Sequence, residues 1–257
     1  MVLAGCALLS CGCGPGAEAD GPDASPGWTE PIVAASLPPA GPVAQQALRA
    51  SPRHGEWIDV PLPGADVPLR TWVVYPQQSA AAPVVLVIHE IYGMSDWVRA
   101  VADALAAEGF VAVAPDLLSG RGPGGGGTPS FAGRGVREAI RKLSADEVAR
   151  RLDAARTWAL DQPAVADATG CVGFCWGGRM CFAYAARQPK LDAAVVYYGT
   201  APQDRARLAA IACGVLGLYG GDDARVTATV PDTAAAMKAL DKAYTHTTCQ
   251  RYRDSLD

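Results

Sequence analysis

The pattern of apolar and polar positions becomes regular from about Glu56 onward. Residues 57–62 and residues 69–75 each alternate apolar and polar side chains, which is typical of half-exposed strands. Pro63 and Gly64 lie between the two runs and favour a turn. The two runs therefore predict an antiparallel hairpin at one edge of a sheet.

Beyond the hairpin, short apolar runs rich in β-branched residues alternate with segments of helical spacing. Such runs are typical of strands that are buried on both faces of a parallel sheet. The expected strands are 84–88, 110–115, 169–174, 192–198, 214–219 and 244–248. The expected helices are 96–108, 144–161, 176–187 and 231–240. This alternation predicts an α/β fold, with a mostly parallel central sheet of about eight strands and helices on both faces.

The first part of the chain, residues 1–52, has a different character. It opens on a short apolar run, and Leu3-Ala4-Gly5-Cys6 resembles a bacterial lipobox in which Cys6 is lipidated; Cys11 is a weaker lipidation candidate. The stretch from Cys13 to Pro52 is rich in Gly, Ala and Pro, which predicts a flexible linker. We expect residues 53–257 to form the folded domain.

A lipobox-like start indicates export, as a periplasmic or membrane-anchored lipoprotein. The alternative is a cytoplasmic protein, because a signal needs a cationic n-region and the first positive charge is Arg49. No segment has the ~20 consecutive apolar residues that a membrane-spanning helix needs. We therefore expect contact with a membrane only through a lipid anchor.

Composition narrows the functional classes. Half of the 257 residues are hydrophobic and the formal net charge is −4, which disfavours nucleic acid as a partner. The eight cysteines and three histidines lack zinc-site spacing, so we expect neither a metal nor another cofactor. The glycine-rich segment 120–127 lacks the order of a nucleotide-binding loop and is interpreted as a mobile surface loop. We expect a monomer that acts on a small molecule.

The strongest chemical motif is Gly173-Phe174-Cys175-Trp176-Gly177-Gly178, which fits the nucleophile elbow G-x-Nuc-x-G. A predicted strand precedes it and a predicted helix follows, as an elbow requires. The glycines leave room for a tight turn, and the helix start beside Cys175 favours its thiolate. The N–H of Trp176 points to the same place and supplies half of an oxyanion hole.

Four segments in order resemble the dienelactone hydrolase family. They are Val87-Ile88-His89-Glu90-Ile91-Tyr92-Gly93, Ala114-Pro115-Asp116-Leu117, the elbow, and Tyr219-Gly220-Gly221-Asp222-Asp223-Ala224-Arg225-Val226. The resemblance covers roughly residues 56–244 and implies an α/β-hydrolase fold. It also implies hydrolysis of an enol-lactone or related ester, of the carboxymethylenebutenolidase type, through a cysteine nucleophile.

The resemblance implies a role for five residues. Cys175 is the nucleophile, and Glu90 is the acid that interacts with the resting cysteine and helps to control its ionisation. The N–H of Ile91 completes the oxyanion hole with that of Trp176. Asp223 orients the catalytic histidine, with the adjacent Asp222 as its rival. For His89 we favour a role in satisfying backbone groups.

The sequence departs from the family at its end. The family has a Gly-His loop and a closing helix after the last strand, and here His246 falls within the expected strand instead. We interpret His246 as a strand residue and the chain as a C-terminally shortened hydrolase with impaired turnover. The alternatives are a general carboxylesterase or thioesterase, and a non-catalytic lipoprotein with a reactive Cys175. Arg121 and Arg179 are interpreted as surface residues rather than as carboxylate-binding groups.

Overall fold

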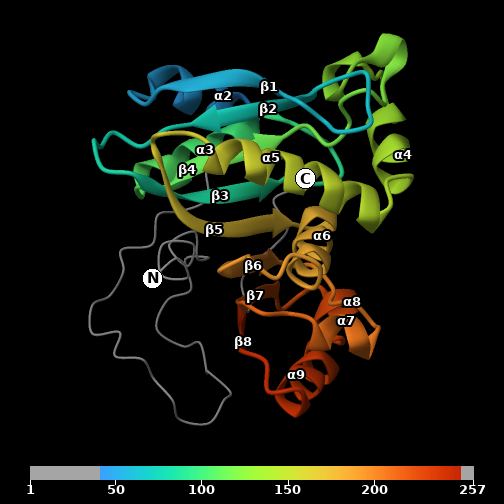
Figure 1. Cartoon of the computed structure of the whole chain (residues 1–257). Helices are drawn as coiled ribbons and strands as arrows, with labels where there is room; N and C mark the ends of the chain where they lie inside the picture. Colours follow the sequence, from blue (N-terminus) through green and yellow to red (C-terminus); the bar gives the residue numbers. More distant parts are fainter. Residues whose placement is uncertain (1–40, 250–257) are drawn as a thin grey trace.

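A computed structural model describes residues 41–249 of the chain (Figure 1). The lipidation candidates Cys6 and Cys11 lie outside the described residues. One eight-stranded sheet runs through the molecule in the order β1-β2-β4-β3-β5-β6-β7-β8. The strands are β1 (Gly55–Val60), β2 (Leu69–Val74), β3 (Ala82–Ile88), β4 (Val111–Pro115), β5 (Val165–Phe174), β6 (Ala193–Tyr197), β7 (Gly214–Gly220) and β8 (Tyr244–Cys249).

The expected hairpin and the mostly parallel sheet are both confirmed. Strands β1 and β2 pair antiparallel at one edge, in a register that sets Trp57 opposite Trp72, and β2 pairs antiparallel with β4. All the other pairings, from β4–β3 through β7–β8, are parallel. The carboxyl ends of the six parallel strands therefore lie along one edge of the sheet, where the loops of an α/β protein form binding sites.

Helices cover both faces of the sheet. On one face the buried cluster joins β3, β4 and β5 to α5 (Ala145–Leu160), α6 (Trp176–Ala185) and α9 (Val230–Ala239). Figure 1 shows α5 and α6 on the near side of the sheet. On the other face, α3 (Asp96–Ala107) packs on β2, β3 and β4. Alternate side chains of β3 serve the two faces: Leu86 contributes to the first cluster and Val85 to the second.

One segment that composition assigns to the linker is helical. Residues Pro42–Ala50 form α2, which packs on α3 and buries Ala44 completely. Pro42 stands at the start of the helix, where a missing N–H costs nothing. The linker prediction is wrong for these residues because the short segment is amphipathic: Ala44 and the half-buried Leu48 lie one turn apart on the same face of the helix.

Three short helices were not expected from the sequence: α4 (Gly135–Arg141), α7 (Arg205–Ala209) and α8 (Ala224–Thr227). Each buries one apolar side chain: Ile140, Leu208 and Val226. Helical periodicity is not recognisable in so few turns. The expected capping box is confirmed in its first half, because the hydroxyl of Ser144 accepts a hydrogen bond from the N–H of Glu147.

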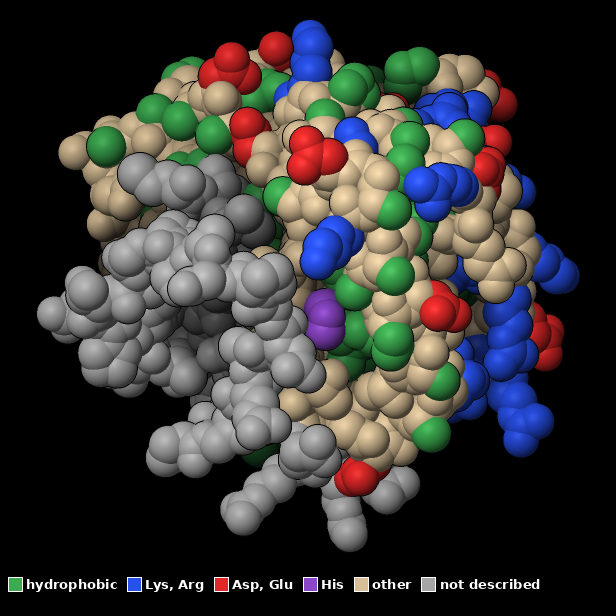
Figure 2. Space-filling view, turned by 90° about the horizontal axis from the view of Figure 1, so that it is seen from below, with side chains coloured by type: hydrophobic (Ala, Val, Ile, Leu, Met, Phe, Trp, Pro, Cys, Tyr) green, Lys and Arg blue, Asp and Glu red, His purple; other side chains and the backbone are tan. Residues whose placement is uncertain are grey.

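The surface of the described part shows no continuous apolar area. Among residues 41–249, one large hydrophobic side chain is exposed, that of Val43. In Figure 2 the hydrophobic side chains are scattered among polar ones, and basic side chains gather toward one edge of the view. None of the helices in this part of the chain is long and apolar enough to cross a bilayer.

Candidate active site

Cys175 occupies a sharp turn between β5 and α6. Its backbone angles are φ 55° and ψ −114°, a combination that side-chain-bearing residues rarely adopt. Two hydrogen bonds hold the turn: the N–H of Cys175 donates to the carbonyl of Tyr197 at 3.0 Å, and the carbonyl of Cys175 accepts from the N–H of Arg179 at 3.1 Å. The side chain is thereby fixed at the carboxyl edge of the sheet, at the first turn of a ten-residue helix.

The glycines of the motif have the steric role that the sequence predicts. A Cβ on Gly173 would lie 2.1 Å from the carbonyl oxygen of Gly177, and a Cβ on Gly177 would lie 2.4 Å from the carbonyl oxygens of Ile88 and His89. Both collisions are with backbone, which cannot swing away. The helix that follows the turn therefore approaches the end of β3 as closely as an unsubstituted backbone allows.

The register of β3 and β5 brings the candidate acid and oxyanion groups level with Cys175. Ile88 and Gly173 are partners in adjacent parallel strands, so Glu90 and Cys175 each lie two residues beyond the same pair. Glu90 is 8% exposed. Ile91 follows Glu90, and Trp176 follows Cys175 as the first residue of α6. Two backbone segments that carry candidate N–H donors thus lie side by side at one edge.

His89 is completely buried beneath this edge and holds backbone groups, as expected. Its Nε2 accepts the N–H of Leu117 at 3.2 Å, and its Nδ1 lies 2.9 Å from the carbonyl oxygen of Glu90. Because Nε2 accepts, the ring proton is on Nδ1, which donates to that carbonyl. Burial lowers the pKa of His89, and the nearby Asp116 opposes this effect only in part.

The loop after β4 is fixed to the loop after β3 by Asp116 and Thr128. The Asp116 carboxylate accepts the hydroxyl of Thr128 and the N–H of Thr128, both at 2.7 Å. The Thr128 hydroxyl in turn accepts the N–H of Met94 at 3.1 Å. Thr128, which directly follows the glycine-rich segment 120–127, is therefore held in place, and a Cβ on Gly127 would lie 2.3 Å from Asp116 Oδ2.

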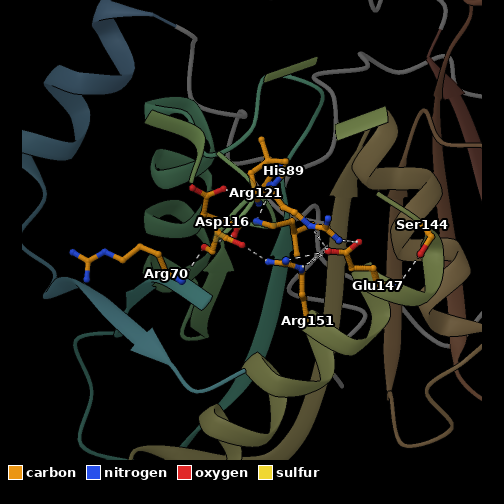
Figure 3. A network of polar contacts seen from close by, with 10 residues as sticks. Arg70, His89, Asp116, Arg121, Ser144, Glu147 and Arg151 are labelled. Carbon is orange, nitrogen blue, oxygen red and sulfur yellow. Dashed lines mark hydrogen bonds and ion pairs between the residues drawn. The ribbon is translucent and has the colours of Figure 1, made fainter. Parts of the chain in front are cut away.

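A charged network borders the same loop (Figure 3). Arg151 is 4% exposed, donates to the carbonyl of Ser119 at 2.8 Å, and pairs with Glu147 at 3.0 Å. Arg121 is half-exposed and pairs with the same Glu147 carboxylate. The prediction that Arg121 is a surface residue agrees with this ion pair, and Arg179 is exposed on α6.

The second acid lies at another part of the edge. Asp223 follows β7, which is separated from β5 by β6, and its Oδ1 accepts the N–H of Val226 at 3.2 Å as the N-cap of α8. Its rival Asp222 is exposed. The cap role is one of the two alternatives that the residue pattern leaves open for Asp223.

His246 lies within β8, where it pairs with Gly217 and its ring lies tilted against that of Tyr244, with ring centroids 5.5 Å apart. The last pair of these strands is Gly220 with Cys249, three residues further on, which is about 10 Å along a strand. The interpretation of His246 as a strand residue is therefore confirmed, and the structure does not bring it to the carboxyl edge.

Tyr198 lies at the same edge as Cys175, and the sequence did not indicate its conformation. It follows β6 as Cys175 follows β5, because Phe174 and Tyr197 are register partners. Its φ is 41°, and its N–H donates to the carbonyl of Leu218 at 2.7 Å. A tyrosine with positive φ at this edge is constrained by its neighbours, and no local pattern announces such a conformation.

Among the residues that the structure describes, no group of three or more His, Cys, Asp or Glu side chains is arranged to hold a metal ion. The groups that the strand register sets beside one another at the elbow are the thiol of Cys175, the carboxyl of Glu90 and the backbone N–H groups of Ile91 and Trp176. This set is compatible with nucleophilic acyl transfer.

A strand–turn–helix elbow at the carboxyl edge of a mostly parallel eight-stranded sheet defines the α/β-hydrolase class. The chain belongs to the dienelactone hydrolase family, which matches residues 69–254.

Relatives and solved structures agree with this assignment. A Salmonella typhimurium protein named as a carboxymethylenebutenolidase is 33% identical over 179 residues, which cover 65% of this chain but only 64% of the relative. A protein of the same name from Methylorubrum extorquens is 32% identical over 213 residues, covering 78% of this chain and 72% of the relative. A Klebsiella pneumoniae structure named as a dienelactone hydrolase superposes with TM-score 0.70 at 26% identity, covering 80% of this chain and 92% of the other. A dienelactone hydrolase structure from Anabaena variabilis shares the fold. It superposes with TM-score 0.62 at 21% identity, covering 80% of this chain and 89% of the other.

Proposed function

We propose that this chain hydrolyses ester or lactone bonds, of the carboxymethylenebutenolidase type, with Cys175 as the nucleophile. The observation that carries the proposal is the backbone of Cys175 at φ 55° and ψ −114°, fixed between a strand end and a helix start. Strain of this kind persists only where the surroundings impose it, and it clusters at reactive positions. The names of the relatives indicate the class of bond.

The reaction follows from the groups at the edge. Glu90 accepts the thiol proton, and the thiolate of Cys175 attacks the carbonyl carbon, forming an S–C bond while the carbonyl oxygen becomes an oxyanion. The N–H groups of Ile91 and Trp176 stabilise that oxyanion. When the intermediate collapses, the C–O bond to the leaving group breaks and Glu90 returns the proton to the departing oxygen. Water then cleaves the thioester, which releases the acid and restores the thiol.

An enol leaving group suits this arrangement better than a simple alcohol. An enolate is a weaker base than an alkoxide, so its departure depends less on proton donation. Hydrolysis of the thioester is the step that most needs a base near neutral pH. The position of His246 inside β8 and the engagement of both ring nitrogens of His89 favour fast acylation and slow deacylation.

A general carboxylesterase or thioesterase is the same chemistry with another substrate. The second candidate, a reactive thiol without turnover, is favoured by the same placement of the histidines. The two candidates differ in one observable: a hydrolase releases more than one product molecule per chain, whereas a reactive thiol without turnover stops after a single acylation.

The lipid anchor on Cys6 is a separate part of the proposal. It is tested by comparing metabolic labelling with a radioactive fatty acid in the wild type and in Cys6→Ser.

The experiment is stopped-flow hydrolysis of p-nitrophenyl acetate and of an enol-lactone by the wild type, Cys175→Ala and Cys213→Ala. Cys213 is the matched control because it is a buried thiol whose pKa burial raises to about 12. We expect a burst of p-nitrophenol in the wild type and in Cys213→Ala, with acetyl found on Cys175 by peptide mass mapping, and no burst in Cys175→Ala. A burst of equal size in Cys175→Ala contradicts the proposal.

A further inference from the structure

The segment that carries the Ile91 N–H is a short loop between β3 and the helix α3. Inside the loop, the N–H of Gly93 donates to the carbonyl of Glu90 at 3.1 Å, and the N–H of Ser95 donates to the carbonyl of Gly93 at 3.0 Å. These bonds give the loop its shape. They do not fix its position relative to the neighbouring strand β4.

A tether from outside the loop supplies that position. The N–H of Met94 donates to Thr128 Oγ1, and Thr128 lies beyond β4, more than thirty residues along the chain. The approach is close: a Cβ on Gly93 would lie 2.4 Å from Thr128 Oγ1, and Gly93 has a φ of 74° that favours glycine. The loop can therefore lie against Thr128 only because residue 93 has no side chain.

Asp116 determines which way the Thr128 hydroxyl points. A carboxylate only accepts, so the single hydroxyl proton of Thr128 is donated to Asp116 Oδ1. The lone pairs of Oγ1 are then available to the Met94 N–H. Asp116 is itself 2% exposed and is held by the N–H of Leu118 at 3.0 Å. The chain N–H···O–H···O is thus directional, and each bond polarises the next.

We propose that Asp116 and Thr128 are positioning residues, which act through the Met94 N–H to hold the Ile91 N–H at the height of the reacting carbonyl oxygen. The inference rests on the proposed function, since it assigns the loop an oxyanion role. The positioning role predicts that loss of the Thr128 hydroxyl slows the acylation of Cys175 but leaves the reactivity of the thiol unchanged.

The test compares Thr128→Val, which keeps the shape of threonine without its hydroxyl, with Thr128→Ser, which keeps the hydroxyl. The measurements are the rate and apparent KM of the p-nitrophenyl acetate burst, and the rate of Cys175 alkylation by iodoacetamide. Alkylation displaces iodide and develops no oxyanion, so it reports the thiol alone. Loss of an oxyanion donor costs about 10²–10³ in rate, and a displaced donor costs part of that.

We expect the burst rate of Thr128→Val to fall about tenfold. Its apparent KM and its alkylation rate should stay within about twofold of the wild-type values. Thr128→Ser should retain most of the burst rate. Faster hydrogen exchange in the peptide that contains Met94 is expected in Thr128→Val alone. A melting curve for each variant shows whether it is folded, and Thr128→Ala repeats the comparison if the valine variant is not.

Two results overturn the inference. If Thr128→Val shows the wild-type burst rate, or if its burst and alkylation rates fall together, the hydroxyl does not act on the oxyanion. A wild type that is alkylated at Cys175 but shows no burst refutes the proposed function, and the positioning role falls with it. The failure of the inference alone is thus distinguished by a normal burst in the wild type.

Discussion

The imidazole of His89 lies against the indole of Trp176, with ring centroids 5.7 Å apart and planes inclined by 17°. The stack joins the end of β3 to the first residue of α6, so it connects the two segments that carry the candidate oxyanion donors. His89 also binds the N–H of Leu117 beyond β4. One buried, neutral ring therefore connects three loops at the carboxyl edge.

We predict that this ring makes stability depend on pH. Burial lowers the pKa of His89 below its ordinary value of 6.5, so on acidification the unfolded chain takes up a proton before the folded chain does. The contribution is fully present above about pH 6.5 and decreases as the pH falls, by at most about 1.4 kcal/mol per pH unit. His89→Gln, which keeps an acceptor for Leu117, should flatten this dependence in urea unfolding between about pH 5 and 7.5. Parallel pH profiles for the two proteins would contradict the prediction.

The glycine at the first turn of α6 yields a second prediction. Gly177→Ala places a Cβ 2.4 Å from two backbone carbonyl oxygens and should lower the free energy of unfolding by about 3 kcal/mol, at the upper end of overpacking costs. Gly64→Ala is the control: its φ is 76° but no atom lies within 4 Å of the added Cβ, so it should cost only about 1 kcal/mol. Denaturant unfolding measures both, and equal costs would show that the backbone at Gly177 shifts to relieve the collision.

The two arginines that share Glu147 should differ in their contributions to stability. Arg151→Ala leaves the buried carbonyl of Ser119 without this donor and should cost about 3 kcal/mol. Arg121→Ala removes a half-exposed ion pair to the same carboxylate and should cost less than about 1 kcal/mol. Thermal and urea unfolding of both single variants check the difference. Similar costs would mean that burial of Arg151 is not what makes its contacts important.

Asp223 allows the cap role to be separated from a catalytic one. Asn is as good an N-cap as Asp, so Asp223→Asn should keep the stability of wild type, while Asp223→Ala should lose about 1 kcal/mol. The acylation step proposed above uses Cys175, Glu90 and backbone N–H groups, whereas Asp223 is expected to orient a histidine, so both variants should keep the acylation burst. A burst that is reduced in Asp223→Asn at unchanged stability would instead assign Asp223 to the reaction.

The local sequence was sufficient for most of the strands and for the elbow. Apolar runs such as 84–88 and 214–219 form strands because they are long enough to be buried and carry no competing helical signal. The elbow is recognisable from its motif, although only part of its steric reason is local: a Cβ on Gly173 would collide with Gly177, four positions on, whereas Gly177 leaves room for the distant end of β3. His89 could likewise be assigned to backbone contacts.

Only the tertiary structure decided the contacts between residues that are distant in the sequence. Helix α2 depends on its packing against α3, and Tyr198 lies beside the elbow because the strand order sets β6 beside β5. The link from Asp116 through Thr128 to Met94 crosses two loops, so no window of neighbouring residues contains it. The sequence determined the nucleophile elbow through its glycine motif between a strand and a helix, whereas the position of the groups around it arises from hydrogen bonds that form only when the sheet is assembled.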